Sequence, residues 1–304
     1  MPATHPGSVR LFHFAGIDVF VHWSWLLVAI YQIQGRPKDY ESFFWNVLEY
    51  LTIFGIVLLH EFGHALACRQ VGGTANRIML WPLGGVAFVS PPQRPGAVLW
   101  SIAAGPLVNV LLVPILFGAS YLANPSGLFD PLSDLDRYLG SIIIINLALL
   151  VFNMLPIYPL DGGQIAQALL WFVIGQARSL LLVSSFGLIV GTGLVALAFW
   201  FQDMWGVVLM GFIALRSWKG FQQARAMLRI LNAPRHQELH CPACGAPPLA
   251  GKYWACGKCG VKFDTFDERG VCPGCGGQFP ITQCPACQTK HPIEAWGPPT
   301  AAKQ

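Results

Sequence analysis

The chain has 304 residues, of which 54% are hydrophobic and 11% are charged, and its mean hydropathy is +0.50. A soluble domain is typically about 25% charged, so the composition excludes an ordinary soluble protein and indicates several helices within a membrane. The net charge of +4 is small and by itself excludes no class of partner.

Six apolar segments approach the length of about 20 residues that a helix needs to cross a bilayer. The first is interrupted by His22 and is not followed by an A-x-A-like site, so we expect no cleavable signal peptide. The N-terminus is then expected to remain and to anchor the chain. The six predicted spans are residues 17–33, 43–67, 97–122, 139–155, 180–200 and 204–218.

The distribution of basic residues predicts the orientation of these spans. With both ends of the chain in the cytoplasm, seven basic residues lie inside and three lie outside, as the positive-inside rule requires. The inside residues are Arg10, Arg69, Arg77, Arg94, Arg178, Arg216 and Lys219, and the outside residues are Arg36, Lys38 and Arg137.

After the last span, residues 219–235 mix basic and apolar side chains at helical spacing, which predicts an amphipathic helix at the interface. Pro234 is expected to end this helix. We therefore predict a membrane domain over residues 1–232 and a small cysteine-rich domain over residues 233–304.

A metal-binding motif, HEFGH, occupies residues 60–64 inside the second span. Residues four apart share one face of a helix, so His60 and His64 can bind one metal ion, with Glu61 beside them as general base. The alternative is a pair of buried histidines satisfied by their neighbours. Ionisable groups at membrane depth are costly and are usually functional, which favours the metal site.

A third ligand is predicted in the segment NMLPIYPLDGG, residues 153–163. A catalytic zinc needs three protein ligands and an open position for water, and Asp161 lies in an apolar setting. Pro156 and Pro159 are expected to break the fourth span there. The alternative role for Asp161 is to cap a helix. Both motifs lie near the cytoplasmic ends of spans that run in the same direction, so they are expected to meet.

Together the motifs HEFGH and N-x-x-P-x-x-x-x-D-G resemble those of the site-2 protease family of intramembrane zinc metalloproteases. The resemblance covers about residues 8–230, and the six-span layout is similar to the sporulation-factor processing branch. It implies an all-α polytopic membrane protein in a bacterial inner membrane. It also implies that His60, His64 and Asp161 bind the catalytic zinc and that Glu61 activates water.

Two further segments are candidates for binding substrate. WPLGGVAF, residues 81–88, predicts a short β-like segment near 81–89, whose Gly84 and Gly85 could admit an unwound substrate by strand addition. Asn109, in AGPLVN, and Asn153 could hold the substrate backbone or polarise the scissile carbonyl. The alternative for either asparagine is an ordinary hydrogen bond between helices.

Eight of the nine cysteines form four C-x-x-C pairs near the C-terminus. This is metal-ligand spacing and it resembles tandem or double zinc ribbons, so we expect two closed four-cysteine zinc sites. Pairing consecutive knuckles is the simplest arrangement, and a nested pairing remains open. The cysteines are Cys241, Cys244, Cys256, Cys259, Cys272, Cys275, Cys284 and Cys287.

Three functions follow from these motifs. The first is an intramembrane zinc metalloprotease that cleaves a membrane-bound protein substrate within the lipid bilayer. The second is a catalytically idle membrane scaffold whose zinc ribbons bind a cytoplasmic protein partner, and the third is a membrane hydrolase that acts on a lipid. The basic residues of the cysteine-rich domain are mixed with acidic ones, which disfavours nucleic acid as a partner.

Overall fold

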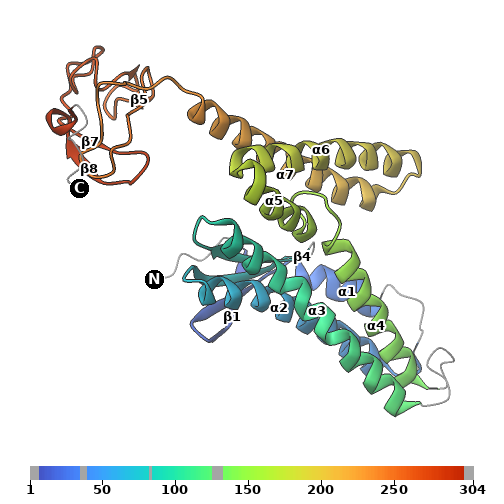
Figure 1. Cartoon of the computed structure of the whole chain (residues 1–304). Helices are drawn as coiled ribbons and strands as arrows, with labels where there is room; N and C mark the ends of the chain where they lie inside the picture. The colour runs from blue at the N-terminus through green and yellow to red at the C-terminus, as the bar shows by residue number, and fades with distance from the viewer. Residues whose placement is uncertain (1–6, 35–39, 82–83, 125–132, 298–304) are drawn as a thin grey trace. The chain divides into compact units, whose positions relative to one another are not determined.

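A computed structural model describes residues 7–34, 40–81, 84–124 and 133–297. The chain divides into two compact units, Met1–Arg225 and Ala226–Gln304. The first unit is mostly helical and contains one sheet. The described residues of the second unit comprise the end of the helix that leaves the first unit, short strands and turns (Figure 1). The predicted outside residues Arg36 and Lys38 lie outside the described residues.

Within the described part of the chain, four helices are long and apolar enough to cross a membrane. They coincide with the second to fifth predicted spans, so the chain has the character of an integral membrane protein. The four are α2 (Phe43–Gln70), α3 (Pro95–Ala123), α4 (Asp134–Asn153) and α6 (Gln176–Trp200).

The first predicted span differs from the structure. Its first residues form strand β2 (Ile17–His22), and the helix that follows, α1 (Trp25–Gln34), has 10 residues. At 1.5 Å per residue that helix is about 15 Å long, half of the hydrocarbon thickness. Pairing of β2 with neighbouring strands buries Ile17 and Val19 completely and takes this stretch out of the helix.

The last predicted span also differs. Helix α7 (Met204–Leu231) runs for 28 residues without interruption, where the sequence predicted a span and a separate interfacial helix. No proline or glycine pair breaks the chain between the two segments, so one helix continues through both.

The sheet of the first unit has four strands in the order β1-β2-β3-β4. The expected β-like segment is confirmed as strand β4, but three further strands were not predicted. β2 and β3 are parallel, and the two outer pairs are antiparallel. The strands not yet given are β1 (Ser8–Phe14), β3 (Thr74–Trp81) and β4 (Gly84–Ser90).

Helix α2 packs against one face of this sheet and joins it into one core. Ile78 and Leu80 of β3 are fully buried there against Val57 and Ala65 of α2. The C-terminal end of α2 is also tied to the turn between β1 and β2, because the Arg69 guanidinium donates to the carbonyl of Gly16. The edge strand β4 lies beside the second half of α2, where Ala87 and Val89 pack against the same core.

The chain breaks between α4 and α5 (Asp161–Ile174), as the two prolines predict. The turn folds back closely on itself, since a Cβ at Gly162 would collide with the Met154 carbonyl and one at Gly163 with the backbone of Ile157. Asp161 is the first residue of α5, directly after the turn that separates α5 from α4.

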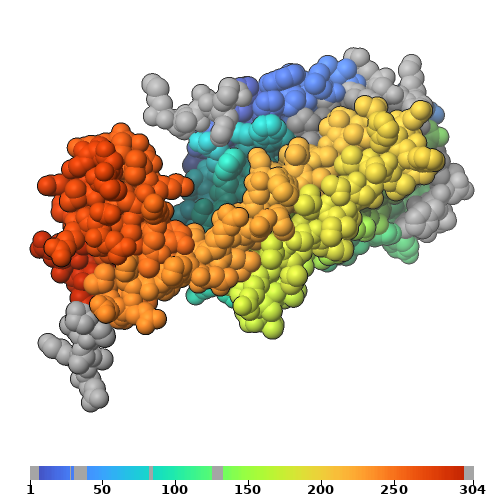
Figure 2. Space-filling view, turned by 90° about the horizontal axis from the view of Figure 1, so that it is seen from above, coloured from blue at the N-terminus to red at the C-terminus, as the bar shows by residue number. Residues whose placement is uncertain are grey.

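The second unit is small and compact, as Figure 2 shows in orange to red. Two clusters of buried cysteine and aromatic side chains form its core. Its regular elements are β5 (Trp254–Ala255), β6 (Lys262–Phe263), β7 (Ile281–Gln283), β8 (Lys290–Pro292) and the 3-10 turn η1 (Ile293–Ala295).

Candidate metal centre

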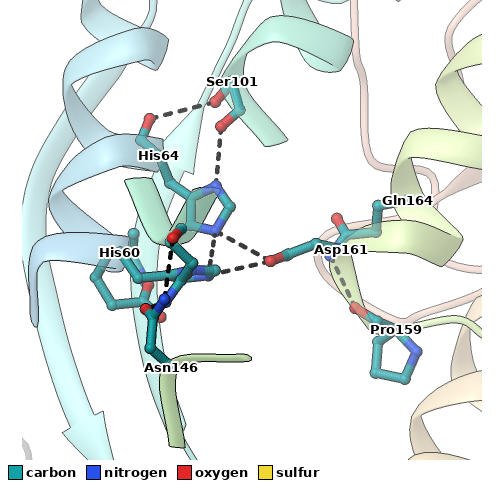
Figure 3. A network of polar contacts seen from close by, with 10 residues as sticks. His60, His64, Ser101, Asn146, Pro159, Asp161 and Gln164 are labelled. Carbon is teal, nitrogen blue, oxygen red and sulfur yellow. Dashed lines mark hydrogen bonds and ion pairs between the residues drawn. The ribbon is translucent and has the colours of Figure 1, made fainter. Parts of the chain in front are cut away.

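Three side chains from two distant parts of the sequence meet in the first unit. His60 and His64 project from adjacent turns of α2 toward Asp161 at the start of α5 (Figure 3). The Asp161 Oδ2 lies 3.1 Å from His60 Nε2 and 3.5 Å from His64 Nε2, and the two Nε2 atoms are 3.1 Å apart. Both histidines are 6% exposed, so the cluster is buried.

Hydrogen bonds to the Nδ1 atoms of the two histidines orient both rings so that each Nε2 faces the Asp161 carboxylate. His64 Nδ1 lies 2.9 Å from the Ser101 carbonyl, which can only accept, so Nδ1 carries the proton. His60 Nδ1 lies 2.6 Å from the Asn109 Oδ1. Two lone pairs and a carboxylate oxygen then converge, an arrangement that is repulsive without a cation between them.

The donor set fits zinc. A tetrahedral zinc ion has bonds of about 2.0–2.1 Å to nitrogen and oxygen, so its ligand atoms are about 3.3 Å apart. The three separations given above lie close to that value. Two histidines and one carboxylate also match the donor set of a catalytic zinc, which leaves one position open for water.

Glu61 lies beside this cluster and is held by the edge strand β4. Its Oε2 accepts a hydrogen bond of 2.7 Å from the backbone N–H of Ala87. A Cβ at Gly85 would collide with the Glu61 carboxylate, so the absence of a side chain at Gly85 lets the strand approach. Glu61 is 6% exposed and lies next to His60 in sequence.

The turn that carries Asp161 is braced from α7. The Ser217 hydroxyl donates to the Tyr158 carbonyl, and the ring of Tyr158 lies against Gly220, where a Cβ would collide with it. Inside the turn, the Gln164 amide donates to the Pro159 carbonyl at 2.8 Å (Figure 3). Asp161 therefore sits on a segment held from two sides.

The candidate substrate-binding residues fall in different places. Asn109 is fully buried behind His60 and bonded to it, which fits the alternative of a hydrogen bond between helices better than contact with a substrate. Asn153 is the last residue of α4, half-buried at the break. Gly84 begins β4 opposite Trp81. Roles for Asn153, Gly84 and Gly85 remain predictions.

Several residues around the cluster were not predicted from the sequence. They are Asn146 of α4, which bonds to Asn109, together with Ser101, Ala87 and Ser217. Asn146 left a signal, because it is the single amide between Ser141 and Asn153 in an otherwise apolar run. Ser101 and Ala87 act through backbone groups, which no side-chain pattern can reveal.

The eight C-terminal cysteines form two clusters, and the pairing is nested. The simplest expectation, in which the first knuckle pairs with the second and the third with the fourth, is wrong. The first knuckle instead clusters with the fourth and the second with the third, and the Sγ atoms of each cluster lie within 4.8 Å of one another. A bridge between His240 and Gly297 brings the two ends of the unit together, which joins the first knuckle to the last. The clusters are Cys241, Cys244, Cys284 and Cys287, and Cys256, Cys259, Cys272 and Cys275.

Backbone amides support the thiolate form in the inner cluster. The N–H of Lys258 donates to Cys256 Sγ and that of Gly274 to Cys272 Sγ, each at 3.4 Å. Hydrogen bonds from the backbone N–H groups of Cys259 and Lys258 outweigh burial and lower the pKa of Cys256 to about 6. The thiolate is the form of cysteine that binds a metal.

Comparisons with known proteins agree with this geometry. Residues 49–198 match the model of peptidase family M50. A zinc metalloprotease of Methanocaldococcus jannaschii is 32% identical over 180 residues, which are 59% of this chain and 50% of that protein. Stage IV sporulation protein FB of Bacillus subtilis is 31% identical over 155 residues, 49% of this chain and 46% of that protein.

A solved structure, the site-2 protease from Methanocaldococcus jannaschii, superposes with a TM-score of 0.52 at 27% identity. The match covers 70% of this chain and 95% of that one. The chain spans about half the length of the curated relatives it matches. Over residues 49–198, which carry the two histidines, Glu61 and Asp161, the chain belongs to peptidase family M50, the site-2 protease family.

Proposed function

We propose that the chain is an intramembrane zinc metalloprotease that hydrolyses a peptide bond in or near a transmembrane segment of a membrane-bound protein. The observation that carries this proposal is the meeting of His60, His64 and Asp161 beside Glu61 on apolar helices. Family M50 membership and the zinc metalloprotease named among its relatives support it.

The proposed chemistry assigns a role to each of these side chains. The two histidines and Asp161 would hold a zinc ion, which lowers the pKa of a bound water to about 7 and polarises a carbonyl. Glu61 would take the proton of that water and pass it to the leaving amine. The hydrogen bond from Ala87 would keep the Glu61 carboxylate in place for both transfers.

A substrate segment must be extended to be cleaved, because the hydrogen bonds of a helix shield its peptide groups. Strand β4 lies at an edge of the sheet and Ala87 directs its N–H away from β3. Strand alternation then places the N–H groups of Gly85 and Val89 on the same open edge. We propose that the unwound substrate pairs with this edge, with Gly84, Gly85 and Asn153 along its path.

We further propose six membrane crossings, with both termini in the cytoplasm of a bacterial inner membrane. The four apolar helices would supply four crossings and α7 a fifth. Helix α1, at 10 residues, is too short to cross an ordinary bilayer, so the sixth crossing would require the bilayer to be thinned around it. The membrane domain would comprise residues 1–232 and the cysteine-rich domain residues 233–304. In the latter, two structural zinc ions would occupy the nested clusters, and the ribbons would bind a cytoplasmic protein partner.

Metal content tests the catalytic proposal. We expect three zinc ions per chain in detergent-purified wild type, one for each proposed zinc site, and two in His60→Ala/Asp161→Ala. In liposomes that also contain single-span reporter proteins tagged at both ends, wild type should cleave a reporter and Glu61→Gln should not. Two zinc ions in both proteins, with no cleavage, would overturn the protease proposal in favour of an idle scaffold.

A further inference from the structure

Two asparagines from different helices are buried together behind His60. Asn146 of α4 is 1% exposed and Asn109 of α3 is fully buried. They exchange two hydrogen bonds: the Asn109 Nδ2 donates to the Asn146 Oδ1 at 2.8 Å, and the Asn146 Nδ2 donates to the Asn109 backbone carbonyl at 3.0 Å. Within the described part of the chain, Asn146 forms its side-chain hydrogen bonds with Asn109 and none with His60.

The directions of these bonds follow from a single obligatory acceptor. A backbone carbonyl cannot donate, so the Asn146 group that faces the Asn109 carbonyl is its NH2, which turns the Asn146 Oδ1 toward Asn109. The Asn109 side chain must then present its NH2 to Asn146 and its Oδ1 to His60. His60 can bond to that oxygen only through a protonated Nδ1, which leaves the Nε2 lone pair free.

We propose that Asn146 is a positioning residue that fixes, through Asn109, the Nδ1–H tautomer of His60 and so selects Nε2 as its metal-binding nitrogen. This inference rests on the proposed zinc site. The two histidines reach the same state differently, because His64 uses the Ser101 carbonyl whereas His60 depends on a side-chain amide. An amide can rotate and offer either group to His60, so it needs a second residue to hold it.

The tautomer can be measured without zinc and without activity. In zinc-free protein labelled with 15N-histidine in lipid bilayers, solid-state NMR reports which ring nitrogen carries the proton, and His60→Asn identifies the His60 signals. The readout is the proton on Nδ1, since without zinc the Nε2 can also hold a proton against Asp161. We expect Nδ1 of His60 to be fully protonated in wild type and partly unprotonated in Asn146→Leu. Zinc affinity of the membrane site should fall by about 10–100-fold in the variant.

A second variant separates tautomer control from general damage. In Asn109→Asp/Asn146→Leu the carboxylate can only accept, so it should restore the Nδ1–H tautomer without Asn146. Thr52→Val is the matched control, since it removes another polar contact between α2 and α4, the 2.7 Å bond to Tyr138, away from His60. We expect no change in that variant. Asn146→Ala serves the same purpose if the leucine variant fails to fold.

An unchanged tautomer and unchanged zinc affinity in Asn146→Leu, or no restoration by the double variant, would overturn the inference. A wild type that binds no zinc at the membrane site would instead contradict the proposed function. The NMR measurement on zinc-free protein would still decide the role of Asn146, so the two failures are distinguishable.

Discussion

The Ala87 N–H of the edge strand β4 donates to the Glu61 carboxylate of α2 at 2.7 Å. This bond ties the proposed general base to the strand along which we propose that the substrate lies. Gly85, two residues earlier, lets the strand approach Glu61 closely. The position of the base and the position of the substrate edge are therefore set by the same short stretch of backbone.

Replacing Glu61 with glutamine should abolish cleavage and leave metal binding intact. Loss of a general base typically costs about 10²–10⁴-fold in rate, and Glu61 is not among the three clustered donors. Reporter cleavage and zinc content measured on the same preparation check this. A Glu61→Gln protein that still cleaves would remove Glu61 from the proposed chemistry.

A side chain at Gly85 should displace Glu61. Since a Cβ there would collide with the carboxylate, we expect Gly85→Ala to lower the cleavage rate by at least about tenfold, toward the loss of a general base. Zinc content should stay the same. Gly55→Ala is the matched control, because that glycine faces open space on the same helix as Glu61. Equal rates in the two variants would contradict the close approach of β4.

Proline at Val89 tests strand addition. Ala87 and Val89 pack on the same face of β4, so strand alternation from Ala87 directs the Val89 N–H to the open edge. Val89→Pro is then expected to remove a donor for the substrate rather than a bond to β3. We expect reporter cleavage to fall with zinc content unchanged. Leu11→Pro is the control, since Leu11 lies at the β-bulge of the opposite edge strand. Cleavage at the wild-type rate in Val89→Pro would count against pairing at this edge.

The nested pairing of the cysteines predicts how zinc is lost in two double variants. Cys244→Ser/Cys284→Ser removes two ligands of one cluster and should cost one zinc ion, whereas Cys244→Ser/Cys259→Ser damages both clusters and should cost two. Consecutive pairing predicts the reverse for these variants. Elemental analysis of the two proteins, each compared with wild type, decides between the arrangements.

Asp264 should stabilise the cysteine-rich unit above acidic pH. Burial alone would raise its pKa, but hydrogen bonds from the N–H groups of Gly251 and Phe266, and from His236, outweigh burial and lower it. A lowered pKa in the folded state contributes stability that is present above the unfolded value of about 3.9 and is lost as pH falls through the folded value.

The expected effect of Asp264→Asn follows from that sign. At pH 7 the variant should be less stable by about 1–3 kcal/mol, and the difference should shrink as pH falls below about 4. Protease resistance of the unit in the full chain, followed across pH, measures this. A difference that stays constant down to pH 2 would show that the charge of Asp264 does not contribute.

Local features of the sequence were enough to identify much of this molecule. The HEFGH motif needs only helical spacing to bring His60 and His64 to one face, and each C-x-x-C knuckle closes within four residues. Long apolar runs determine membrane helices because lipid demands internal hydrogen bonding. The two prolines near Asp161 were enough to predict the break before α5.

The tertiary structure decided what depends on contacts between distant segments. Strand β2 forms because it pairs with β3, some sixty residues later in the chain. Without that partner, the same apolar residues predict part of a membrane-spanning helix. The bond from Ala87 to Glu61 and the Asn109–Asn146 pair join elements whose relative rotation no local pattern contains. The nesting of the cysteine knuckles likewise follows from how the chain returns on itself, because knuckles of equal spacing can pair in either order.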